Sequence, residues 1–522
     1  MSTLVEFWQM LTWSLWKKKS LKPEELLQEE RKLFNYNLHT LSTKAGIVTC
    51  LLCFWIILTP RCVQANTEAY QKEAFKALLN LDYNKAQSIL EKQNIKQAKD
   101  YYLLSLINTT ALMLEQDKSA VNSFFTRSNE NLKALKSADD QISLSVKAEI
   151  EFHQAIVYTL NEQEFYAAIA FRQSYSSVKS YQQKYPDSKA LSKLSGIQQI
   201  MLGSIPERYD WILNFLGMKG DINLGLELLN EASTLDSINH TEAIIWKSLL
   251  QAYVLRETEE AFIKLFELNE RNTSKLGNLL AGVVAIKDAD SKKAIKLLSD
   301  DSLPAVGSYH LAEAYLHKGD YVLAIENYKK YLSQTKSEQL IKDAYFKTGM
   351  CFLFLNQSSE ANRHFELARK LGKTNTEADK YADKVLNSNE PINIKIQQAR
   401  YYTDGGFYHE AQRVLMNIDA KDLNSKKDKI EYSYRLARVT HKQNKLNLAK
   451  TYYLQTIELN EIEPWYFAPN AALQLGYILE EEGDYTQALM YYQKALSYKK
   501  HEYKNSIDSK ARTAIAQLKS AR

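Results

Sequence analysis

The sequence predicts an all-α protein, built as a superhelical solenoid of antiparallel helix pairs. Apolar residues recur at helical spacing along almost the whole chain after residue 65, and no stretch shows the strict alternation of a half-buried strand. Glycine and proline are scarce, at 16 and 8 of the 522 residues, whereas tyrosine is abundant at 33, and this composition suits stacked helices better than a sheet. The third observation is internal repetition at a period of 30 to 50 residues, which is typical of stacked helical arrays.

The repetition is most regular after residue 275, where each repeat carries an alanine in its second predicted helix. These marker alanines are Ala294, Ala324, Ala361, Ala411, Ala449 and Ala488, at spacings of 30, 37, 50, 38 and 39 residues. Twelve residues before each of the last five markers stands a second small residue, namely Ala312, Gly349, Ala399, Ala437 and Gly476. A constant offset between small side chains is expected where two helices cross closely. Stacking such pairs buries one continuous core and creates a concave face.

The clearest repeat is Ala472–Lys500, "ALQLGYILEEEGDYTQALMYYQKALSYKK". Its Leu-Gly pair, its Gly-Asp-Tyr turn and the alanine three residues after that turn resemble a tetratricopeptide repeat (TPR), and the resemblance implies a TPR-like solenoid. The ideal period of that repeat is about 34 residues. We therefore expect the excess residues to lie in longer turns or longer helices, and the 50-residue step contains the polar stretch Asn387–Asn393.

Two segments resemble a narrower family, the tetratricopeptide-repeat 39 and yeast inclusion-body-clearance proteins. In "SIPERYDWILNFLGMKGDINLGLELL", the matching residues are Ile205, Pro206, Leu216, Gly217, Gly220, Asp221, Gly225 and Leu226. The ranges Glu463–Leu489 and Tyr503–Ile515 are similar to the closing repeat and final helix of that family. Glu207 replaces the second proline of the family pattern, and Ser509-Lys510 keeps its closing Ser-Arg element only loosely. The resemblance implies an α-helical, adaptor-like protein and brings no defined chemistry with it.

Four regions are predicted along the chain. Residues 1–44 form a polar and basic leader, and residues 45–65 form a signal peptide or a membrane anchor. Residues 66–270 form a degenerate TPR-like helical region, and residues 271–522 form the regular array with a C-terminal capping helix.

The second region carries the prediction about localisation. Its apolar run Ala45–Thr59 follows Lys44 and precedes the small residue Ala65, as in a secretory signal cleaved after Ala65. The run is shorter than the roughly 20 apolar residues of a membrane-spanning helix. We therefore expect a periplasmic or otherwise exported protein, with possible membrane contact through residues 45–59. The leader is long for the charged region of a signal, so two alternatives stay open: a misassigned start, or an uncleaved anchor that leaves the leader in the cytoplasm.

Catalytic chemistry is not predicted. The sequence has no HExxH metal site, no GxSxG nucleophile elbow and no zinc-like pairing of cysteines and histidines. His310 and His317 lie seven residues apart, but core or solvent histidines are the better interpretation. Eight Lys and Arg against five Glu in the first 65 residues give +3 of the net charge of +5, and the remaining +2 is too small for a nucleic-acid footprint. We expect no catalytic residues, no cofactor and no metal, and an enzyme of unknown class is a remote alternative.

Partner binding is the predicted function. In TPR proteins the first helix of each pair lines the concave groove, and aromatic or methionine side chains there suit an extended or helical peptide. Counting from the markers, the predicted outward positions are Tyr309, Glu313, Phe346, Met350, Tyr434, Arg438, Leu473 and Tyr477. The alternative for each is packing against neighbouring repeats, and the carboxylate clamp of chaperone-binding TPRs is not reproduced. The sequence thus predicts a non-catalytic scaffold or adaptor for a protein or peptide partner, or alternatively a membrane-anchored organising protein.

Overall fold

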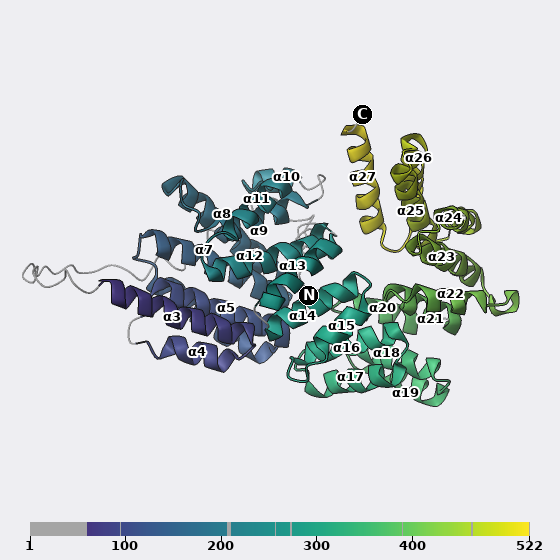
Figure 1. The fold of residues 1–522 in the computed structure, drawn as a ribbon, viewed down its shortest axis with the longest axis horizontal. Coiled ribbons are helices and arrows are strands. Elements are labelled where there is room, and N and C mark those ends of the chain that lie inside the picture. The colour runs from purple at the N-terminus through teal and green to yellow at the C-terminus, as the bar shows by residue number, and fades with distance from the viewer. Residues whose placement is uncertain are drawn as a thin grey trace, which may run out of the picture. The chain divides into compact units, whose positions relative to one another are not determined.

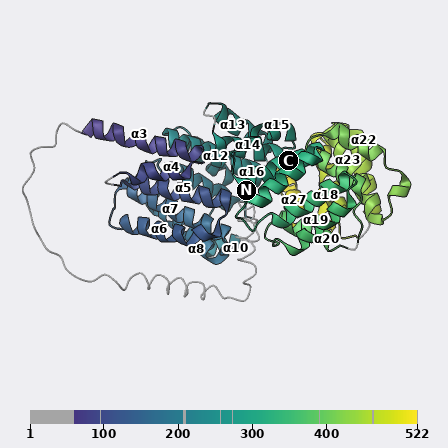
Figure 2. The same ribbon diagram turned by 90° about the horizontal axis from the view of Figure 1, so that it is seen from below.

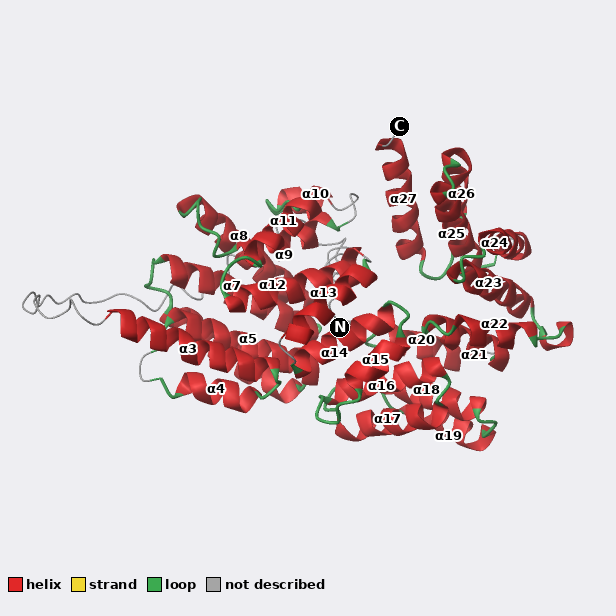
Figure 3. Ribbon diagram, in the orientation of Figure 1, coloured by secondary structure: helices red, strands yellow, loops and turns green. Residues whose placement is uncertain are grey.

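The structure is a computed structural model that describes residues 60–93, 96–205, 210–255, 257–271, 274–388, 390–460 and 463–520. Every regular element within these ranges is a helix, which confirms the predicted all-α class (Figure 3). The leader 1–44 and the apolar run 45–59 lie outside the described residues. None of the described helices is long and apolar enough to cross a membrane. The chain divides into two compact units, which consist of residues 1–284 with 335–338 and of residues 285–334 with 339–522.

Unit 1 contains the helices up to α14, several of which pack as antiparallel pairs (Figures 1 and 2). Their bounds are α3 (Pro60–Leu79), α4 (Tyr83–Glu91), α5 (Ala98–Glu115), η1 (Lys118–Ala120), α6 (Val121–Ala134), α7 (Gln141–Leu160), α8 (Glu164–Lys184), α9 (Ser192–Gly203), α10 (Asp210–Phe215), α11 (Ile222–Ala232), α12 (Ser237–Leu250), the π-helix η3 (Gln251–Leu255), α13 (Thr258–Arg271) and α14 (Lys275–Lys287). The extensive contacts are α3 with α4, α5 with α7, α7 with α8, α9 with α11, and α12 with α13. The predicted cleavage position after Ala65 falls within the range of α3.

A buried cluster of charges joins four helices of unit 1. The ammonium group of Lys193, on α9, lies 3.2 Å from Glu149 of α7 and 3.1 Å from Glu242 of α12. It also donates a hydrogen bond of 2.5 Å to the hydroxyl of Tyr102 on α5. Lys193 is only 2% exposed, and both glutamates are buried. Two acids therefore share one base in the interior, so this part of the core depends on the lysine.

Unit 2 contains the regular repeats. Its elements are α15 (Ser291–Leu298), α16 (Ala305–Lys318), α17 (Tyr321–Gln334), α18 (Ile341–Phe354), α19 (Ser358–Lys370), α20 (Glu377–Leu386), α21 (Ile394–Asp404), α22 (Tyr408–Met416), η4 (Ala420–Asp422), α23 (Lys426–Lys442), α24 (Leu446–Asn460), α25 (Phe467–Glu481), α26 (Tyr485–Ser497) and α27 (Lys504–Ser520). Five helix pairs pack extensively, namely α16 with α17, α18 with α19, α21 with α22, α23 with α24 and α25 with α26. The last five marker alanines all lie on the second helix of their pair.

The small residues mark helix crossings, as the sequence predicts. All six marker alanines are fully buried. At the last crossing, a Cβ atom added to Gly476 would lie 2.4 Å from the ring atom Cε1 of Tyr492. At Gly349 the corresponding distance to Cε1 of Phe365 is 2.5 Å. At these two crossings, an aromatic ring of the second helix occupies the space that a Cβ atom would need.

Replacing Ala488 with tryptophan should lower the stability of unit 2 by about 1–3 kcal/mol, because the extra side chain overpacks a crossing with no free space. Chemical unfolding followed by circular dichroism measures the change. Met490→Trp is the matched control, since Met490 lies on the same helix and is 50% exposed. An unchanged unfolding midpoint for Ala488→Trp would show that the register of the last repeat is wrong.

The 50-residue step between Ala361 and Ala411 corrects one expectation. The excess residues form an additional helix, α20, which packs on α18 and α19. The buried carboxylate of Asp379 on α20 accepts hydrogen bonds from the backbone N–H groups of Leu340, at 2.9 Å, and Asp343, at 3.0 Å. These donors lie at the start of α18 and have no partner within that helix. Asp379 therefore caps α18 from a neighbouring helix.

The pair that follows α20 docks back on earlier helices of unit 2. Helix α21 packs against α16, and the amide of Gln398 donates a hydrogen bond of 2.8 Å to the hydroxyl of Tyr321 at the start of α17. The backbone N–H of Ser291, at the start of α15, donates to the carbonyl oxygen of Gly405, which follows α21, at 3.2 Å. These contacts hold α21 near α18, so both helices contribute to the same face of unit 2.

Candidate functional site

The eight predicted groove residues divide into two groups. Five are core residues with at most 2% exposure, namely Tyr309, Phe346, Met350, Tyr434 and Leu473. The other three, Glu313, Arg438 and Tyr477, are half-buried. The prediction that all eight side chains face outward is therefore corrected for the first five.

The physical reason lies in the packing within each pair. Four of the five, Tyr309, Phe346, Tyr434 and Leu473, stand 15 residues before a marker alanine, whereas Met350 stands 11 residues before Ala361. The ring of Tyr309 contacts Tyr328 at a centroid distance of 5.8 Å, and the ring of Tyr434 lies 6.5 Å from that of Tyr453. Such aromatic contacts fill the core of the pair. That any of the eight residues binds a partner stays a prediction.

The half-buried Glu313 belongs to a second ionic cluster, between α16 and α18. The ammonium group of Lys347 lies 2.6 Å from the carboxylate of Glu313 and 2.8 Å from that of Asp343. Burial opposes ionisation of Glu313, but Lys347 and His310 outweigh it and hold the pKa of this carboxyl well below its ordinary value. Nδ1 of His310 donates a hydrogen bond of 2.9 Å to the same carboxylate. These groups bind one another, so the cluster stabilises the contact between α16 and α18.

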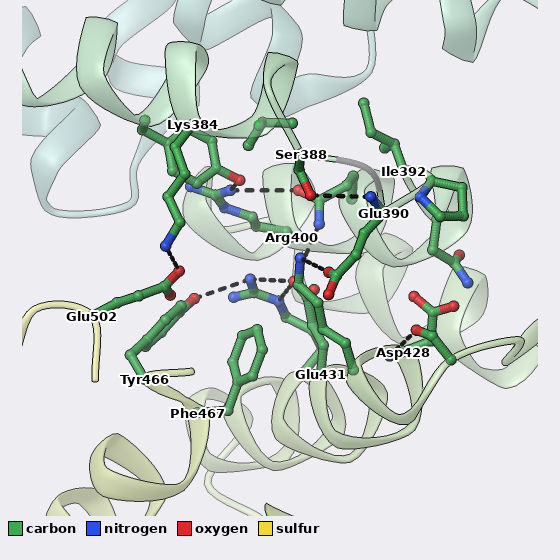
Figure 4. A pocket seen from close by; sticks show the side chains of 18 of the residues that line it. Lys384, Ser388, Glu390, Ile392, Arg400, Asp428, Glu431, Tyr466, Phe467 and Glu502 are labelled. Carbon is green, nitrogen blue, oxygen red and sulfur yellow. Dashed lines mark hydrogen bonds and ion pairs between the residues drawn. The ribbon is translucent and has the colours of Figure 1, made fainter. Parts of the chain in front are cut away.

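A pocket of about 100 Å³ opens in unit 2 (Figure 4). Its lining comes from the first helices of four successive pairs, α18, α21, α23 and α25, together with α20 and the segments that follow α20 and α26. Phe346 and Met350, two of the predicted groove residues, form part of its wall. The other six predicted groove residues do not line the pocket.

A network of polar side chains crosses the floor of the pocket. Arg435 on α23 binds Oε1 of Glu431 through Nε at 3.1 Å and through Nη2 at 2.7 Å. Nη2 of Arg435 also donates to the hydroxyl of Tyr466 at 3.1 Å, and the amide of Gln397 on α21 donates to the same Oε1 at 3.1 Å. The network fixes α21, α23 and the start of α25 relative to one another.

Two ion pairs lie at the rim of the pocket. Lys427 lies 2.8 Å from Glu390, and Lys384 on α20 pairs with Glu502, which precedes α27. Tyr503, beside Glu502, is half exposed and packs edge-on against Tyr466. The segment between α26 and α27 is thus tied to the rim through one charge pair and one aromatic contact.

Arg400 is the functional candidate that the sequence analysis missed. Its guanidinium group donates hydrogen bonds to the hydroxyl of Tyr381 and, at 3.4 Å, to Oε1 of Gln397, and it lies 3.5 Å from the carboxylate of Asp404. Arg400 stands 11 residues before the marker Ala411. The same offset gives four of the predicted residues, Glu313, Met350, Arg438 and Tyr477. The same offset of 11 residues, counted from Ala411, therefore identifies Arg400 from the sequence.

The groups in the pocket suit recognition of a side chain. Hydrogen-bond donors, carboxylates and aromatic faces converge there, but the volume is far below the roughly 300–1,000 Å³ of small-molecule and cofactor sites. No cluster of three or more His, Cys, Asp or Glu side chains in the described part of the chain is arranged to hold a metal ion. The thiol of Cys351 is fully buried, and burial raises its pKa far above the ordinary value, so the thiolate form is disfavoured there.

Comparison with known proteins identifies one repeat. A family model described as "Tetratricopeptide repeat" matches residues 469–502, which begin in α25, include α26 and end beside the pocket. No curated protein sequence matches the chain.

Among solved structures, the chain is similar to the apo form of the quorum sensor NprR from B. thuringiensis, with 16% identity and a TM-score of 0.27, over 76% of this chain and 99% of that one. It is similar to human IFIT1 in a dimer with PPP-AAAA, with 14% identity and a TM-score of 0.30, over 81% and 94% of the two chains. It is also similar to yeast Tom70, with 13% identity and a TM-score of 0.26, over 87% and 97%. This chain is thus an all-α array of TPR-like helix pairs that contains a tetratricopeptide repeat at residues 469–502.

Proposed function

We propose that this protein is a non-catalytic scaffold or adaptor that binds a protein partner through unit 2. The observation that carries the proposal is the pocket lined by the first helices of four successive pairs. Its rigid polar floor and aromatic walls suit one side chain of a partner, while the repeats on either side offer surface for the rest of a peptide. The tetratricopeptide repeat at residues 469–502 supports the same function.

The proposal includes a location and a closer kinship. Residues 45–59 direct export, with cleavage after Ala65, or hold the protein at a membrane with residues 1–44 in the cytoplasm. The sequenced N-terminus of the native protein distinguishes the two, since Asn66 supports cleavage and Met1 supports the anchor.

Kinship with the tetratricopeptide-repeat 39 family rests on Ile205–Leu226 and the closing repeat. In support of it, Gly225 makes a close helix crossing, where an added Cβ would lie 2.8 Å from the carbonyl oxygen of Gly196.

Blocking the pocket should abolish binding of the partner. Ser388 is exposed and lines the pocket, so Ser388→Trp fills the opening without entering the core. We expect at least about a 30-fold loss of affinity, because the blocked pocket removes a central contact of the interface. The partner is captured with the full chain as bait, identified by mass spectrometry and titrated by calorimetry.

The matched control is Ser333→Trp, which adds the same side chain at an exposed position of α17, away from the pocket. It should bind the partner as tightly as the unmodified chain. Equal affinity of the partner for both tryptophan variants and the unmodified protein would refute binding at this pocket.

A further inference from the structure

The charges around the pocket identify what it receives. We infer that it accepts the lysine or arginine side chain of a protein partner, with the cationic head on Asp428. The inference rests on the proposed function, because it names the partner's chemistry at the same pocket. It differs from the sequence-based expectation, which placed aromatic and methionine contacts in the groove and specified no charge.

The charged side chains that line the pocket form ion pairs, with the exception of one acid. Four basic and four acidic side chains line the pocket, and each basic one has an acidic neighbour. These ion pairs are Arg435 with Glu431, Lys427 with Glu390, Lys384 with Glu502, and Arg400 with Asp404, which lies outside the lining. Asp428 is the acid that remains without a basic partner among the described residues.

Asp428, the acid in question, is largely buried. The residue is 8% exposed and lies in the first turn of α23, where its backbone N–H donates to the hydroxyl of the N-cap Ser425 at 3.0 Å. Its carboxylate makes no hydrogen bond or ion pair within the described ranges, and Figure 4 shows it among the lining side chains. The helix N-terminus offsets part of the cost of this charge. The carboxylate of this largely buried residue lines the pocket without a basic neighbour among the described residues, and a cation that entered the pocket would offset the cost of its burial.

Glu431 provides a second hydrogen-bond acceptor on the same face of α23. All three donors to Glu431 use its Oε1, so Oε2 is left as an acceptor in the described structure. Glu431 lies three residues after Asp428, so the two carboxylates are neighbours along one face of α23. An ammonium group has three donors and a guanidinium group has five, enough to reach both.

The shape of the pocket agrees with a long basic side chain. Its volume of about 100 Å³ suits one such side chain and little more. Phe346, Met350 and Phe467 provide apolar wall for the aliphatic stem, and the faces of aromatic rings attract a cation. An anion is disfavoured, because the guanidinium group of Arg400 is already held by Tyr381, Gln397 and Asp404.

The test uses the full chain and four fluorescein-labelled peptides, Gly-Gly-Xaa-Gly-Gly with blocked ends, in which Xaa is lysine, arginine, norleucine or glutamate. Fluorescence anisotropy measures each dissociation constant. The lysine and arginine peptides should bind at least about tenfold more tightly than the norleucine peptide, which has the same stem without the charge. Asp428→Asn should remove this preference, and Asp428→Glu should keep part of it. Glu481→Gln, at an exposed acid of α25 outside the lining, should leave it unchanged.

Three results would overturn the inference: tightest binding of the glutamate peptide, a preference for lysine and arginine that survives Asp428→Asn, or no binding by any of the four peptides. Equal melting temperatures of the Asp428→Asn variant and the unmodified chain establish that the variant is folded. The proposed function is judged separately by the Ser388→Trp titration with the captured partner. Loss of partner binding in Ser388→Trp, together with no binding of the four peptides, would support the scaffold function and refute recognition of a lysine or arginine side chain.

Discussion

Replacing Lys193 with methionine is expected to destabilise unit 1 by about 3–5 kcal/mol, because the variant leaves Glu149 and Glu242 buried without their shared counter-charge. Burial already raises the pKa of Glu149, against the opposing effect of Lys193. The variant removes that opposing effect, so protonation of Glu149 favours the folded state. The loss should be largest at neutral pH and shrink as the pH falls toward about 5. Chemical unfolding at both pH values measures it.

Two controls separate the buried charge from a general effect of losing a lysine. Lys189→Met removes a partly exposed ion pair with Glu231 and should cost less than about 1 kcal/mol. The triple variant Lys193→Met, Glu149→Gln and Glu242→Gln removes all three charges and should recover most of the stability. A single variant as stable as the unmodified chain at neutral pH would contradict the buried arrangement of these charges.

The second large effect is expected at Tyr434, which the sequence analysis placed in the groove. Its ring is fully buried against Tyr453 and Phe467, and its hydroxyl accepts a hydrogen bond of 2.7 Å from the amide of Asn470. Tyr434→Ala should therefore cost about 3–5 kcal/mol through the cavity it leaves. Thermal and chemical unfolding of the full chain measure the loss.

The matched variant Tyr434→Phe keeps the ring and removes the hydroxyl, so it should cost only about 1–2 kcal/mol, from the amide left without this partner. The opposite pattern would restore the groove assignment. In that case, Tyr434→Ala would leave the unfolding midpoint unchanged and would abolish binding of the captured partner.

The helix pairs and their crossings could be predicted because each depends on one local rule. A small residue on each helix permits a close approach, and the constant offset of 12 residues fixes which two side chains meet. Fully buried Ala324 and Ala488, and the rings that exclude a Cβ at Gly349 and Gly476, confirm this reading.

The additional helix α20 was missed because it carries no marker alanine opposite a small residue, and its ten residues are too few to show a strong period. Its role as a cap for α18 depends on a contact between Asp379 and Leu340, which lie 39 residues apart. No local pattern encodes that contact. The pocket depends on the same insertion, so its position was not predictable from repeat spacing alone.

The candidate site shows a second limit. The offset from the marker alanine fixes the position of a residue on the first helix. It does not fix whether the side chain packs within its own helix pair or lines the pocket. Tyr309 and Tyr434 face their own second helix, whereas Arg400, at a different offset, lines the pocket. The hydrogen bonds across the pocket join helices that are far apart in sequence, as with Gln397 and Glu431. Only the folded arrangement reveals that Asp428 has no basic partner among the residues that the structure describes.

Site-specific photocrosslinking shows whether a partner docks at this pocket. The full chain carries p-benzoylphenylalanine at position 388 or, as control, at position 333, and is irradiated in an extract of its source cells. We expect a single crosslinked partner at position 388, and the residue that forms the crosslink should neighbour a lysine or arginine. No such product is expected at position 333. The same product at both positions, or at position 333 alone, would contradict docking at this pocket.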